Sequence, residues 1–133
     1  AETKEGWCLA IQARAAALSV GMDYFEVMGV GMFLECEDPN PRHAVHLLWA
    51  EEKVRANYEC AAPAIDQRET LSPGLQVVSL AGLVLMKLQA NRDQDRVHLR
   101  DMIEVGLVGR AMLAGLPAEA AQRLDGLLTE LGR

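Results

Sequence analysis

The stretch from residue 80 to residue 91, LAGLVLMKLQAN, constrains the fold more than any other part of the sequence. As a helix it is apolar on nearly every side, so it must be buried within a larger structure. Ser79 is a suitable N-cap for this helix. Lys87 falls on the same face as Leu83 and Val84, so its ammonium must either reach the surface along its own stem or meet an anion. The rest of the chain must therefore cover this helix and provide for its one charge.

Three other segments are expected to be helical. Residues 3–19 form an alanine-rich amphipathic pattern with Gly21 placed as its stop. A helix capped by Asp93 is predicted at residues 93–105, and Pro117 suits the first position of a helix that ends near residue 131. The C-terminal half is therefore predicted to be helical.

Strands are expected between the first helix and this helical half. The aromatic and β-branched residues at 24–34 indicate one strand, bulged or bent at Gly29, and the short apolar stretch at 43–50 indicates a central strand. Residues 62–74 have the composition of a loop, and residues 75–78 form a third short strand. Because no long helix separates these strands, we expect one α+β domain over residues 1–133, with a small mixed or antiparallel sheet, an N-terminal helix and a helical C-terminal half.

Charge and cysteine content exclude several classes of protein. The net charge of -6 argues against a general nucleic-acid binder, although it leaves room for a local basic pocket that holds one nucleotide. The three cysteines are far apart and suggest neither a zinc site nor a disulfide framework, so we expect free thiols and a cytoplasmic protein. No apolar run approaches the ~20 residues that would span a bilayer, so no membrane partner is expected.

A group of charged side chains surrounds the end of the buried helix. Asn91 and Arg92 are expected to reverse the chain, and on the next helix Asp95 and His98 share one face, with Asp101 beside it. If the two helices form an antiparallel hairpin, Lys87 comes close to Asp95, which we predict as its first partner, with Asp101 as the second. Two interpretations stay open: a ligand site, or an acidic helix start favoured by the helix dipole together with surface ion pairs.

The pattern SLxxLxxMKLxAxRxxDxxHLxD at residues 79–101 resembles the C-terminal motif block of small nucleotidyltransferase-like proteins, including those of the abortive-infection toxin type. Residues 29–55 are similar to the strand–turn–strand region of the same proteins, so the resemblance covers roughly residues 20–107. It implies a mixed sheet flanked by helices that binds a nucleoside triphosphate and magnesium. It also implies that Lys87 and Asp95 belong to nucleotide-handling or catalytic motifs. We expect Asp95 as the catalytic candidate, and ligand contacts from Lys87, Arg92, His98 and Asp101. At His98 many relatives carry an aspartate.

A second group of cations follows the expected strand at 43–50. Lys53 and Arg55 lie in a charged segment, EEKVR, which is either a solvated edge or a set of phosphate-facing cations at the end of the sheet.

The chain departs from the family where the metal site would be. Family enzymes have a Gly-Ser turn and an Asp-x-Asp strand, because carboxylates two residues apart point to the same side of a strand and can both hold magnesium. Here the one Asp-x-Asp, residues 93–95, opens a helix, and His43 and His46 fall on opposite faces of their strand. We therefore expect no metal ligand in this chain, and magnesium and a nucleoside triphosphate only if the family activity is retained.

Two explanations of this departure remain open. Either the sequence begins after the catalytic strands, since it starts at Ala1 rather than at methionine, or it is a degenerate member that kept the scaffold and lost the chemistry. The leading hypothesis is a nucleotidyltransferase-like domain, inactive in nucleotidyl transfer alone, that retains nucleotide or phosphate binding. The alternative is a non-catalytic module that binds a protein or a small molecule. An exposed sheet edge further predicts a homodimer.

Overall fold

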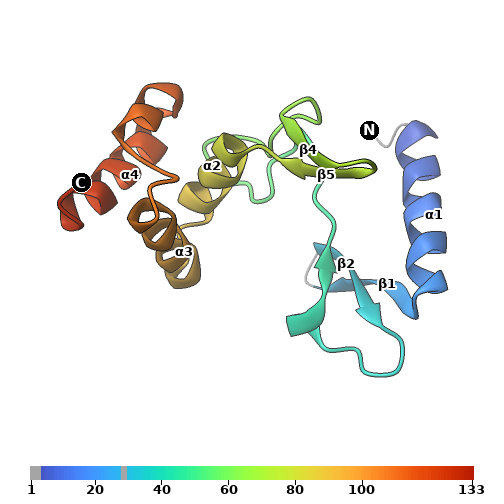
Figure 1. Ribbon diagram of the computed structural model, residues 1–133. Coiled ribbons are helices and arrows are strands. Elements are labelled where there is room, and N and C mark those ends of the chain that lie inside the picture. The colour runs from blue at the N-terminus through green and yellow to red at the C-terminus, as the bar shows by residue number, and fades with distance from the viewer. Residues whose placement is uncertain (1–3, 28–29) are drawn as a thin grey trace. The chain divides into compact units, whose positions relative to one another are not determined.

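The computed structural model describes residues 4–27 and 30–133, with side chains from residue 11 onward. Its elements confirm the predicted α+β class, since an N-terminal helix is followed by antiparallel strands and then by a helical C-terminal half (Figure 1). The contacts divide the chain into two compact units, Ala1–Leu48 and Trp49–Arg133, where the sequence led us to expect one domain. Within the described residues, no helix combines the length and apolar character needed to cross a membrane.

The first unit contains a helix and a small antiparallel sheet. Helix α1 (Lys4–Ser19) leads into strands β1 (Met22–Val27), β2 (Val30–Glu35) and β3 (Val45–His46), with a 3₁₀ turn η1 (Pro41–His43) before β3. The strands lie in the order β1-β2-β3, so β1 and β3 are the edges.

The single strand predicted at residues 24–34 is instead a hairpin of β1 and β2. Val27 pairs with Val30, which leaves a connection of two residues, and Gly29, where a bulge was predicted, lies outside the described residues. The apolar pattern runs from β1 into β2 without a break in the sequence, so it does not show that there are two strands. Gly31 allows a close approach here, because a Cβ at that position would lie 2.8 Å from the hydroxyl of Tyr24.

The strand predicted at residues 43–50 is mostly absent. Only Val45 and His46 pair with β2, opposite Phe33 and Met32, and both are exposed at the sheet edge rather than central. The prediction was wrong because apolar residues alone do not place a strand in the centre of a sheet. Leu48 and Trp49 are likewise exposed.

The second unit begins with a hairpin of β4 (Arg68–Ser72) and β5 (Leu75–Val78). Strand β5 matches its prediction, but β4 falls in the segment predicted as a loop. All five residues of β4, RETLS, are exposed, so this strand has no buried face to produce an alternating apolar pattern. Gly74 takes the turn between the strands with a φ of 83°, which glycine adopts without strain.

Four helical segments complete the second unit. They are α2 (Leu80–Ala90), α3 (Asp93–Glu104), the 3₁₀ helix η2 (Arg110–Gly115) and α4 (Ala118–Glu130). Ser79 caps α2 as predicted, since its Oγ accepts a hydrogen bond from the backbone N–H of Gly82. Asp93 was predicted as the cap of α3 but is its first residue, and Arg92 is the N-cap.

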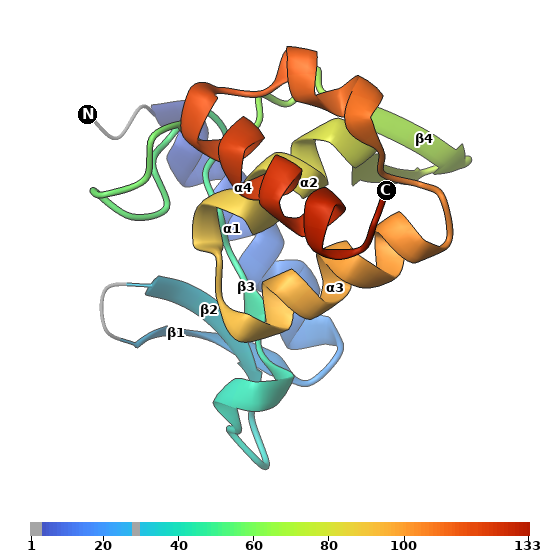
Figure 2. The same ribbon diagram turned by 90° about the vertical axis from the view of Figure 1, so that its left-hand side faces the viewer.

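The core of the second unit forms where α2, α3 and α4 pack together (Figure 2). Val84 and Leu88 of α2 are fully buried, as the apolar surface of this helix requires. Their buried neighbours come from α3, η2 and α4 and include Leu99, Ile103, Val108, Ala120, Leu124, Leu127 and Leu128. Burying a leucine or valine side chain contributes roughly 1.5–3 kcal/mol, so this cluster is the main source of stability in the unit.

Candidate functional site

The connection between α2 and α3 brings together four of the predicted site residues. Asn91 ends α2 in the left-handed conformation, with a φ of 46°, and Arg92 begins α3 directly after it. This short reversal places Lys87 of α2 beside Asp95 and His98 of α3. We call Lys87, Arg92, Asp95 and His98 the α2–α3 corner.

Lys87 meets two partners at this corner. Its Nζ lies 3.6 Å from Oδ1 of Asp95, so the predicted pairing of these residues is confirmed. Nδ1 of His98 is nearer, at 2.8 Å, and was not predicted as a partner. When the Lys87 ammonium donates this hydrogen bond, Nδ1 is the acceptor. Asp101, the predicted second partner, is exposed and forms no ion pair within the described part of the chain.

Asp95 is the centre of the corner and is only 3% exposed. Arg92 holds it through two side-chain hydrogen bonds, from Nε to Oδ2 at 2.6 Å and from Nη2 to Oδ1 at 3.2 Å. The backbone N–H of Arg92 also donates to Oδ2, at 3.3 Å. Burial by itself would raise the pKa of Asp95, but the hydrogen bonds and charge of Arg92, helped by the charge of Lys87, outweigh it and lower the pKa. The carboxylate is therefore ionised and both of its oxygens are engaged.

This arrangement bears on the catalytic role that the resemblance implies for Asp95. A carboxylate that accepts a proton or binds a metal needs a lone pair directed at the reacting group. Asp95 would have to release Arg92 or Lys87 to provide one. The geometry therefore favours binding or structure over catalysis at this residue.

The corner carries an excess of positive charge. Two cations, Lys87 and Arg92, share the single carboxylate of Asp95. The side chain of Arg92 is 67% exposed, and its hydrogen bond with Asp95 raises its pKa, so it stays charged. Its Nη1 has no hydrogen-bond partner in the ranges that the structure describes. An anion in solution can therefore approach the guanidinium without displacing Asp95.

The remaining predicted contacts do not join this corner. Lys53 and Arg55 are exposed in the turns that follow Leu48, and over the described residues no hydrogen bond or ion pair links either one to Lys87, Arg92 or Asp95. The sheet end on which they were expected to lie is absent. Among residues 4–27 and 30–133, no group of three or more histidine, cysteine, aspartate or glutamate side chains is arranged to hold a metal.

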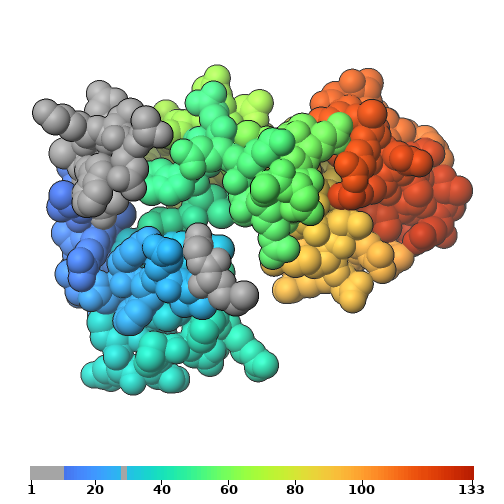
Figure 3. Space-filling model, turned by 180° about the vertical axis from the view of Figure 1, so that it is seen from behind, coloured from blue at the N-terminus to red at the C-terminus, as the bar shows by residue number. Residues whose placement is uncertain are grey.

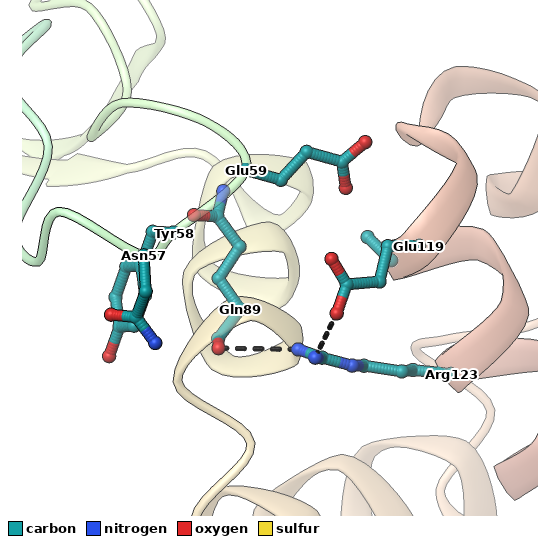
Figure 4. Close-up of a pocket in the computed structure, with 7 residues that line it drawn as sticks. Asn57, Tyr58, Glu59, Gln89, Glu119 and Arg123 are labelled. Atoms are coloured by element: carbon teal, nitrogen blue, oxygen red, sulfur yellow. Dashed lines mark hydrogen bonds and ion pairs between the residues drawn. The ribbon is translucent and has the colours of Figure 1, made fainter.

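A second feature of this unit was missed by sequence reasoning. A polar pocket with a volume of about 40 Å³ lies between the segment at residues 57–59, the end of α2 and the start of α4 (Figure 4). It is lined by Asn57, Tyr58, Glu59, Gln89, Glu119, Ala120 and Arg123. On the surface, the green segment around residues 57–59 meets the orange start of α4 (Figure 3). The one sequence signal was the spacing of Glu119 and Arg123, which puts them on the same face of a helix.

Comparison with known proteins adds no relative. Neither protein-family models nor curated proteins nor solved structures give a match to this chain.

Proposed function

We propose that this chain is a nucleotidyltransferase-like domain that binds the phosphate group of a nucleotide at the α2–α3 corner and does not transfer nucleotides by itself. One observation carries the proposal: two cations converge on a single carboxylate, and one of them, Arg92, remains largely exposed. A guanidinium with a free N–H edge is a suitable donor to phosphate oxygens. The resemblance of residues 79–101 to the family motif block supports a nucleotide as the source of that phosphate.

The proposed lack of transfer activity rests on the missing carboxylates. Nucleotidyl transfer needs charge neutralisation and alignment of the nucleophile, which a metal held by strand carboxylates provides in this family. In this chain the Asp-x-Asp sequence opens α3, and its second carboxylate, Asp95, is engaged by Arg92 and Lys87. Magnesium-dependent incorporation of a labelled nucleotide into any acceptor by the 133-residue chain would refute this part of the proposal.

Thermal unfolding in the presence of ATP tests the binding site. We expect a saturable rise in Tm for the wild type, because a ligand at 100 times its Kd stabilises the folded state by about 2.7 kcal/mol. Arg92→Gln should lose this rise, measured against its own ligand-free Tm. Arg96→Gln is the matched control, since Arg96 lies one turn further along α3 and pairs with the exposed Asp93. An equal rise in Arg92→Gln and in wild type would place the nucleotide elsewhere.

A second candidate function is a protein-interaction module that acts as a homodimer. The observation that favours it is that β1 exposes apolar side chains on both of its faces. Tyr24 is 41% exposed on one face, and Phe25 (40%) and Val27 are exposed on the other. Exposed aromatic side chains are enriched where proteins meet one another. Cys36 is exposed and Cys60 is half-buried, and neither forms a disulfide. Free thiols accord with the proposed cytoplasmic location.

Light scattering tests the homodimer, because it measures the mass of the protein in solution. A mass twice that of the 14.5 kDa chain is expected at high protein concentration, and Phe25→Glu should reduce it to that of the monomer. Val45→Glu provides a comparison, because Val45 is exposed on the opposite edge strand of the same sheet. A monomeric wild type at every concentration would exclude the homodimer.

A further inference from the structure

The polar pocket differs in chemistry from the α2–α3 corner. Three parts of the chain converge on it, and Figure 4 shows their side chains arranged around Gln89. Two of the lining side chains are carboxylates, Glu59 and Glu119, and one is a cation, Arg123. The lining therefore has a net charge of -1, from two negative groups and one positive group.

Arg123 is already engaged by the protein. Its Nη1 donates to the carbonyl oxygens of Leu88 at 2.7 Å and Gln89 at 3.3 Å, at the C-terminal end of α2, and its Nη2 pairs with Glu119. A guanidinium in this position satisfies carbonyls that the end of a helix leaves without partners. Arg123 therefore serves to hold α4 against α2, and it offers little to an incoming anion.

Each of the remaining polar side chains in the lining has an oxygen that can accept a hydrogen bond. Glu59 and Asn57 are exposed, and Tyr58 and Gln89 are half-buried. None of these four side chains forms an ion pair or a hydrogen bond over the part of the chain that the structure describes. An amide or hydroxyl oxygen accepts hydrogen bonds, and an ionised carboxylate only accepts. The ring of Tyr58 adds an aromatic face, which attracts cations. Hydrogen-bond donors with positive charge fit such a lining better than anions do.

We infer that this pocket binds the guanidinium or primary ammonium head group of a small organic cation. Its volume of about 40 Å³ holds roughly three or four groups the size of a water molecule, which matches a head group of a few heavy atoms. Glu59 supplies the charge for the head group, the oxygens of Asn57 and Gln89 accept its remaining protons, and Tyr58 borders it. The assignment uses neither Arg92 nor Lys87 as a ligand, although Tyr58 lies near enough to Arg92 to affect the pKa of that guanidinium.

Titration of the ¹⁵N-labelled full chain with butylammonium tests the inference by NMR. Saturable shifts are expected at the backbone amides of residues 57–59 and of Gln89. Butanol and butyrate have the same carbon chain without the positive charge and should leave these amides unshifted. If neither butylammonium nor methylguanidinium produces a saturable shift up to about 50 mM, which is far above a millimolar Kd, the inference is overturned.

The variant Glu59→Gln tests the assignment of the charge. It keeps the side-chain size and leaves Arg123 and its helix contacts in place, so the fold is preserved. We expect it to weaken butylammonium binding by about two- to fivefold, because Glu59 is exposed and ion pairs of exposed groups are screened by solvent. Glu69→Gln is the control, since Glu69 lies exposed in β4 and gives the same change in net charge. Equal affinity in Glu59→Gln and wild type would overturn the assignment.

Discussion

Asp95 is the one charged side chain that is buried among the described residues. Removing one partner of a buried ion pair destabilises a protein more than replacing both partners with apolar residues, because the first change leaves a buried charge unpaired. Asp95 has two such partners, Arg92 and Lys87, and both approach it within 4 Å. The stability of the α2–α3 corner therefore depends on this residue more than on either cation.

Replacing Asp95 tests that dependence. Asp95→Asn keeps the size of the side chain but removes its charge, so Lys87 and Arg92 lose their shared partner. We expect the free energy of unfolding to fall by about 2–4 kcal/mol, measured by urea denaturation. Asp93→Asn is the control, because the side chain of Asp93 is 98% exposed. It should change the free energy of unfolding by less than about 0.5 kcal/mol. Similar losses in the two variants would contradict the role assigned to Asp95.

The lowered pKa of Asp95 also predicts a pH dependence. A carboxyl group whose pKa is lower in the folded than in the unfolded state contributes stability above its unfolded pKa, near 3.9, and loses that contribution as pH falls through the folded value. The stability difference between wild type and Asp95→Asn should therefore be constant from pH 7 to about pH 5. Below about pH 5 this difference in the free energy of unfolding should become smaller, because the wild type loses the contribution of the ionised Asp95. A difference that widens with acid would give the opposite sign and contradict the pKa direction.

Contacts between side chains could be predicted where they follow from helical periodicity. They could not be predicted where they depend on the conformation of a connecting segment. Lys87 and Asp95 lie on facing sides of two successive helices, so a hairpin was enough to predict their meeting. The nearer contact, with His98, depends on how tightly Asn91 and Arg92 reverse the chain, and the sequence does not specify that distance. Glu59 and Gln89 come from separate segments, which no periodicity relates.

At the level of elements, α2 was the most predictable and the first sheet the least. The all-round apolar surface of α2 required burial, and its cap at Ser79 and its end near residue 91 follow from local chemistry. Strand β4 had no signal, because all its side chains are exposed, and the β1–β2 hairpin looked continuous in sequence. Strand patterns report burial on one face, so a strand without a buried face is not detected.

The N-cap of α2 offers a direct test of this local chemistry. Ser79→Ala removes the oxygen that accepts from the N–H of Gly82 at 3.2 Å, and should destabilise the protein by about 1 kcal/mol in urea denaturation. Ser79→Asp should retain most of the stability, because its carboxylate caps the same N–H and suits the helix N-terminus. Ser72→Ala, exposed at the end of β4, is the control. If Ser79→Ala leaves stability unchanged, the cap contributes nothing in this context.

At the level of the whole molecule, the core is unevenly divided between the two units. The large buried cluster belongs to residues 49–133, whereas the buried apolar residues described in the first unit are Ala17, Met32, Phe33 and Leu34. Chains of so few residues seldom fold unaided.

Separate expression of the two units tests this asymmetry. We expect residues 49–133 to unfold cooperatively on heating and to give dispersed NMR signals, since the fragment keeps the packing of α2, α3 and α4. Residues 1–48 alone should show neither property. A cooperative transition in the shorter fragment would show that residues 1–48 fold independently.

The free edge of β1 carries a feature that affects solubility. At the start of the hairpin the N–H of Cys36 donates a hydrogen bond to the carbonyl oxygen of Gly21. In an antiparallel pair, hydrogen-bonded and non-hydrogen-bonded residue pairs alternate. The pair Tyr24–Phe33 is therefore non-hydrogen-bonded, and the N–H of Tyr24 points away from β2. Asp23 Oδ1 accepts that N–H at 2.7 Å, while Arg14 holds the same carboxylate and, together with this N–H, lowers its pKa. A donor that would otherwise recruit a strand from another chain is thereby occupied. Loss of Asp23 would release this N–H beside the exposed side chains of Tyr24 and Phe25, and would leave the edge of β1 more open to pairing with a strand of another chain.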